Sequence, residues 1–295
     1  MVSIRQNLLN LNQTQRDKPG GQQFSYMGLF DIFKKTDGTN EAVPQQAVNK
    51  EIVNEQVIPV FSDEQRLSLE KTQSIANLLA VPKSERNDQW LDQFLLDLPK
   101  ASFRGGTPQV IAGPDGFPYF QLFLPAPGEE FQSFAIEVMI PEFLLERGFG
   151  VLINPGEIEP DWVLSYGDVL NYSLNGSFFT YESAFSSHND VEDVVGEGEE
   201  IMVGQPAETI LPVHTRTLLK DFFVLNGIQE PKVLMMVRKK GEDVYQDLAF
   251  NITPDQFETE EQYKNMMQTV TWYLPRHYSL IGLHHSDVGD GFMPL

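Results

Sequence analysis

Apolar residues recur with the spacing of amphipathic helices between residues 62 and 99. Ser62-Asp63-Glu64-Gln65 matches a capping box, in which the serine and the glutamine satisfy exposed backbone N–H groups. A second helix follows Ser84, because apolar side chains return at i, i+4 and i+8, and Pro99 ends it. Its apolar face consists of Trp90, Leu91, Phe94, Leu95 and Leu98.

The next pattern is that of a hairpin followed by a helix and two strands. Apolar runs at 110–112 and 117–124 flank Gly113-Pro114-Asp115-Gly116, and Asp-Gly supplies the positive φ angles of a tight turn. A helix is predicted over 134–147, with Gly148 as its C-terminal cap. Strands are predicted at 151–153 and 162–166, and Asp168 then caps a short helix that ends near residue 174.

The C-terminal part of the chain repeats this order of elements. The pattern predicts a helix over 212–226, strands at 232–239 and 244–252, a helix over 254–273 and a strand at 278–283. We therefore predict an α+β fold with two αββαβ-like lobes, each a small antiparallel sheet flanked by helices. An internal duplication would produce this order.

The amino-acid composition of the segments between these elements indicates where the domain boundaries lie. Residues 1–61 read as a disordered or linker segment, in which Met27-Gly28-Leu29-Phe30 resembles the start of a protein. The N-terminal lobe is expected over 62–176 and the C-terminal lobe over 209–295. Six acidic residues lie between Asp190 and Glu200, so 177–208 is expected to be an acidic connector.

Charge narrows the classes of partner. The 295 residues include 42 acidic and 21 basic ones, a net charge of −21, which would repel nucleic acid and an anionic membrane surface. No apolar run approaches the ~20 residues that span a bilayer. The chain has no cysteine, which fits a reducing cytoplasm. We predict a cytoplasmic protein with no cofactor, whose partner is another protein.

Candidate chemistry is sparse. The sequence has no G-x-S-x-G elbow, H-E-x-x-H motif or P-loop. His284, His285, Asp287 and Asp290 are ligand types for zinc or iron. Adjacent residues of a strand point to opposite faces, however, and 287–291 also reads as an ordinary Asp/Gly turn. No metal site is predicted, and this cluster stays an alternative.

The proline-rich loop over 154–162 joins two predicted strands. Loops of this kind bind ligands or simply turn the chain, with Trp162 then filling the core. Trp162, Tyr166 and Asp168 are the candidate binding residues.

Short motifs in the C-terminal third are similar to those of a known family. Pro231-Lys232-Val233 opens a predicted strand, and Pro275-Arg276-His277-Tyr278 precedes the last one. Leu211-Pro212 before a helix and the segment 150–156 add to the likeness. The chain thus resembles the enhanced serine sensitivity protein (SseB-like) family. The resemblance implies a bacterial cytosolic protein and carries over no catalytic residues.

Three functions fit these observations. The leading prediction is a non-enzymatic protein that acts by protein–protein interaction. An immunity or antitoxin-like protein that neutralises a basic toxin by charge complementarity is one alternative. A metal-dependent enzyme that uses the C-terminal His/Asp cluster is the other.

Overall fold

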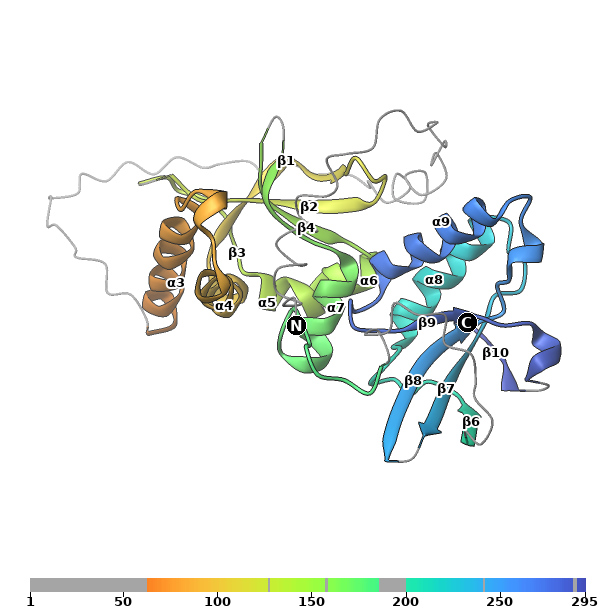
Figure 1. Ribbon diagram of the computed structural model, residues 1–295. Helices are drawn as coiled ribbons and strands as arrows, with labels where there is room; N and C mark the ends of the chain where they lie inside the picture. Colours follow the sequence, from red (N-terminus) through yellow and green to blue (C-terminus); the bar gives the residue numbers. More distant parts are fainter. Residues whose placement is uncertain (1–62, 127, 157–158, 186–199, 241, 289–290) are drawn as a thin grey trace, which may run out of the picture.

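The computed structural model describes residues 63–295 except 127, 157–158, 186–199, 241 and 289–290, and it shows two lobes, each built on one sheet (Figure 1). The α+β fold class predicted from the sequence is confirmed. The segment 1–61 and most of the predicted acidic run lie outside the described residues.

The N-terminal lobe contains α3 (Asp63–Leu79), α4 (Asp88–Asp97), β1 (Phe103–Ala112), β2 (Pro118–Phe123), β3 (Ser133–Phe134), α5 (Ile136–Met139), α6 (Leu145–Arg147), β4 (Gly150–Pro155), β5 (Pro160–Leu164) and α7 (Tyr166–Asn175). The C-terminal lobe contains β6 (Glu200–Gly204), α8 (Val213–Leu225), β7 (Lys232–Lys240), β8 (Asp243–Phe250), α9 (Glu260–Val270), β9 (Leu280–Gly282) and β10 (Met293–Pro294).

The first sheet has the strand order β3-β1-β2-β4-β5. Strands β1 and β2 form the predicted hairpin, whose turn contains Gly116 at a φ of 85°. A helical segment made of α5, a π-helical turn over Ile140–Leu144 and α6 then crosses back and ends at Gly148, at a φ of 70°. Because of this crossover, β4 lies parallel to β2.

The second sheet has the strand order β10-β7-β8-β9, and β6 also pairs with β7. Strand β6 lies opposite residues 235–239 of β7, and β10 lies opposite 232–233. Both short strands therefore follow the same edge of β7, end to end. Helix α9 connects β8 to β9, which are parallel.

Both sheets are therefore mixed, which differs from the antiparallel sheets that the sequence predicted. Each lobe has a hairpin, a crossover helix and a strand parallel to the second hairpin strand. The crossover explains the difference, since a helix between two strands returns the chain to the same end of the sheet. The internal duplication itself stays a prediction.

One continuous cluster of buried apolar residues runs through both lobes. Phe117 of the first hairpin stacks on Trp272, with ring centroids 4.1 Å apart, and Phe222 of α8 contacts Tyr273 at 5.3 Å. The predicted connector also contributes, because Phe178, Phe179 and Phe185 are buried in this cluster. The two lobes thus share a core. No helix among the described residues is both long enough and apolar enough to cross a membrane.

Candidate functional site

The three residues predicted to bind a ligand are all buried. Trp162 is 5% exposed, and Tyr166 and Asp168 are fully buried. They do not line one surface, since Trp162 packs within the N-terminal lobe while the other two lie where the lobes meet. Their role in ligand binding stays a prediction, and their contacts show a structural role.

Trp162 packs in an aromatic cluster between β5 and α4. Its ring lies 4.9 Å from that of Phe94 and 5.8 Å from that of Trp90. Trp90 donates its indole N–H to the Leu78 carbonyl at 2.7 Å. The indole N–H of Trp162 has no acceptor among the described residues.

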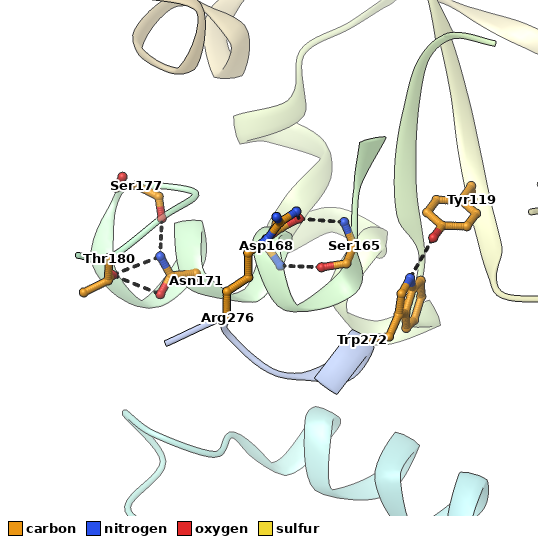
Figure 2. A network of polar contacts seen from close by, with 8 residues as sticks. All are labelled: Tyr119, Ser165, Asp168, Asn171, Ser177, Thr180, Trp272 and Arg276. Atoms are coloured by element: carbon orange, nitrogen blue, oxygen red, sulfur yellow. Dashed lines mark hydrogen bonds and ion pairs between the residues drawn. The ribbon is translucent and has the colours of Figure 1, made fainter. Parts of the chain in front are cut away.

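Tyr166 begins α7 and faces the C-terminal lobe. Its hydroxyl lies 2.9 Å from the Thr215 hydroxyl of α8, and burial raises the pKa of Tyr166. Beside it, Trp272 donates its indole N–H to the Tyr119 hydroxyl at 2.8 Å (Figure 2). Tyr119 in turn donates to Asp115 at 2.6 Å. Burial also raises the pKa of Asp115. Aromatic stacking and buried hydrogen bonds therefore join the lobes.

Asp168 joins the lobes by an ion pair. It forms a capping box with Ser165, in which each side chain accepts a hydrogen bond from the other residue's backbone N–H, at 2.9 and 3.1 Å. Figure 2 shows Arg276 of the C-terminal lobe reaching the same carboxylate. Its Nε and Nη2 donate to the two oxygens at 2.6 and 2.7 Å, a bidentate pair.

The surroundings of Arg276 fix this pair. Burial alone would lower the pKa of Arg276, but the Asp168 carboxylate outweighs that effect and raises it. The guanidinium carbon also lies 4.7 Å from the ring centroid of Phe179. Asn171 holds the chain that carries Phe179, because its amide donates to the Ser177 carbonyl at 2.8 Å and to the Thr180 hydroxyl at 3.1 Å. These contacts hold Asp168, Arg276 and Phe179 together where the two lobes meet.

His277 gives this junction a dependence on pH. The residue is 9% exposed, its ring lies edge-on to Phe185 and Tyr278, and burial lowers its pKa to about 4. The folded state therefore binds the proton less well than the unfolded chain does. The stability from neutral His277 is present above pH ~6.5 and is lost as the pH falls toward 4, by up to about 3 kcal/mol.

We expect His277→Gln to flatten the fall in unfolding free energy between pH 6.5 and 4, because glutamine does not titrate. Urea unfolding at several pH values in this range measures the slope. His285→Gln, at an exposed histidine, is the control and should keep the wild-type slope. An unchanged slope in His277→Gln would show that other groups cause the acid sensitivity.

The described residues do not assemble the alternative metal cluster. His284 Nε2 lies 3.4 Å from Asp255 Oδ1, and both side chains are more than half exposed. His285 lies edge-on to Phe292, and Asp287 closes a turn on the His284 carbonyl at 3.0 Å. No three His, Asp or Glu side chains in the described ranges could hold a metal ion. Asp290 lies outside those ranges.

The exposed surface of β6 is a candidate site that sequence reasoning missed. Ile201, Met202 and Val203 are consecutive and are 45, 58 and 43% exposed. Figure 1 shows β6 and the neighbouring ends of β7 and β8 projecting beyond α8 and α9. Contiguous exposed apolar surface marks interaction sites, and Ile201 and Val203 lie on the same face of the strand.

The acidic residues that precede β6 explain why the sequence analysis did not predict this strand. The run up to Glu200 has the composition of a connector, and only three apolar residues and a glycine follow. The run Ile-Met-Val was nevertheless a short strand signal. It needed β7 as a partner to become a strand, and a local pattern does not reveal that partner.

The chain matches none of the protein-family models, curated proteins or solved structures with which it was compared.

Proposed function

We propose that the protein acts without catalysis, by binding another protein through β6. The exposure of Ile201, Met202 and Val203 on an edge strand carries this proposal. Burying these side chains against a partner would remove apolar surface from water, at about 25 cal/mol per Å². An ordered sheet behind the strand holds the three residues in place before binding, which lowers the entropy cost of association.

Two further assignments belong to the same proposal. The motifs around Pro231-Lys232-Val233 and Pro275-Arg276-His277 support membership of the SseB-like family and a cytoplasmic location. The net charge of −21 favours a basic partner, for which neutralisation of a basic toxin is one specific case.

The test is co-purification from the native host with tagged full-length protein. We expect wild type to retain one stoichiometric partner and Val203→Lys to lose it by about tenfold or more, because lysine on an edge strand opposes docking. Val224→Lys on α8 is a matched control, since Val224 is 41% exposed and Val203 is 43%. Equal recovery of the partner by Val203→Lys and wild type would contradict a role for β6.

A further inference from the structure

Among the described residues, the outer side of β6 is a sheet edge without a strand beside it. Strand β6 pairs antiparallel with β7 from Glu200 opposite Lys239 to Gly204 opposite Met235. Strand β7 is occupied on its other side by β8. Within the described part of the chain, no strand pairs with the second side of β6. Such an edge presents backbone N–H and C=O groups that can bind another strand.

Several other edge strands carry features that limit pairing with a further strand. Natural edges are kept short or carry proline and charged residues. Strands β3, β9 and β10 have only two or three residues, and β5 begins at Pro160, whose carbonyl accepts from Lys83. Strand β6 has five residues, and its centre is Ile201-Met202-Val203.

Side chains of β6 offer apolar contacts on both faces of the sheet. Ile201 and Val203 share one face because residues two apart point the same way, and Met202 lies on the other. In the register, Val203 is opposite Met236, which belongs to the small apolar cluster on this face of the sheet. An added strand would therefore gain backbone hydrogen bonds and apolar contacts together.

Charge decides between a second copy of this chain and a different protein. Two copies would bring together net charges of −21 each, and their mutual repulsion opposes pairing. A basic segment is attracted by the same charge, which also speeds its approach. Lysine and arginine stems additionally cover apolar side chains with their methylene groups.

We propose that β6 binds a basic, extended segment of a different protein, which adds to the sheet as a further strand beside β6. This inference rests on the proposed function and specifies the partner and its mode of binding. The partner segment alternates apolar residues with lysine or arginine, so that its backbone pairs with β6 and its charges meet the acidic protein.

Synthetic peptides test this mode with the full-length protein. The probe is a short peptide of alternating valine and lysine, titrated by calorimetry. A fully N-methylated version keeps the charges and side chains but has no N–H donors, and a valine/glutamate version reverses the charge. We expect the valine/lysine peptide to bind, and both altered peptides to bind about tenfold more weakly or worse. Hydrogen exchange should show new protection of amides in 200–204.

Protein variants complete the test. Val203→Lys should weaken binding of the valine/lysine peptide about tenfold, and Val224→Lys should leave it unchanged. Equal binding of the N-methylated peptide would overturn strand addition in favour of charge alone. Equal binding of the valine/glutamate peptide would overturn the basic partner. A wild-type dimer in sedimentation that Val203→Lys dissociates would assign the edge to a second copy.

The two proposals fail separately. Suppose that the Val203→Lys variant loses a native partner but wild type does not bind the valine/lysine peptide. That result would support the proposed function and overturn strand addition. Binding of the peptide to β6 without any native partner would support the mode and contradict the proposed function.

Discussion

Replacing Arg276 by methionine is expected to lower the unfolding free energy by about 3–5 kcal/mol. The substitution leaves Asp168 fully buried with no cation beside it. The Ser165 backbone N–H, which donates to the carboxylate at 2.9 Å, does not replace a bidentate guanidinium at 2.6 and 2.7 Å. A buried carboxylate without its partner charge is costly.

Replacing the acidic partner, Asp168, is expected to lower the unfolding free energy by less than replacing Arg276. Asp168→Asn leaves the Arg276 side chain unpaired, but that side chain is 32% exposed and can turn toward water. Asparagine also keeps an oxygen that can accept from the Ser165 N–H. The double variant should recover part of the loss of Arg276→Met, because it leaves no buried charge.

Urea unfolding followed by circular dichroism measures these differences. Lys264→Met is the control: it removes one positive charge as well, at an exposed ion pair with Glu260. It should leave the unfolding midpoint close to that of wild type. An Arg276→Met variant as stable as Lys264→Met would show that the ion pair contributes little.

Short sequence patterns were sufficient to predict the position of many helices and strands. The predicted helix over 212–226 is α8, Val213–Leu225, and the predicted strand over 232–239 is β7, Lys232–Lys240. The Asp-Gly turn correctly placed the first hairpin. Each of these elements carries its own start, end and apolar face, so the local pattern is enough.

Contacts between residues far apart in the sequence could not be predicted from local patterns. Asp168 and Arg276 are 108 positions apart, and the sequence around Asp168 indicated a helix cap and a candidate binding residue but no ion pair. The burial of Trp162 was one of two interpretations of its loop, and its contacts with the aromatic residues of α4 agree with that interpretation. The parallel pairings of β4 and β9 likewise depend on where a helix returns the chain. Contacts with the second lobe therefore account for the burial of Tyr166 and Asp168, and a local pattern does not reveal them.

Gly167→Ala is the second change for which we expect a large effect. A Cβ atom at this position would lie 2.0 Å from the Leu274 carbonyl oxygen and 2.4 Å from its carbon. Both atoms belong to backbone, so no side chain can rotate to relieve the contact. Alanine in a helix is normally favoured over glycine by about 1 kcal/mol. Here we expect the opposite sign, a loss of about 3 kcal/mol or more.

Gly204→Ala is the matched control, because nothing lies within 4 Å of its added Cβ and its φ is not positive. Thermal unfolding should leave this control within about 0.5 kcal/mol of wild type. For Gly167→Ala we expect one transition at a lower midpoint. Separating the lobes would relieve the clash, but it would also expose the stacked rings of Phe117 and Trp272 and the buried carboxylate of Asp168. Two transitions would instead show that each lobe is stable without the junction.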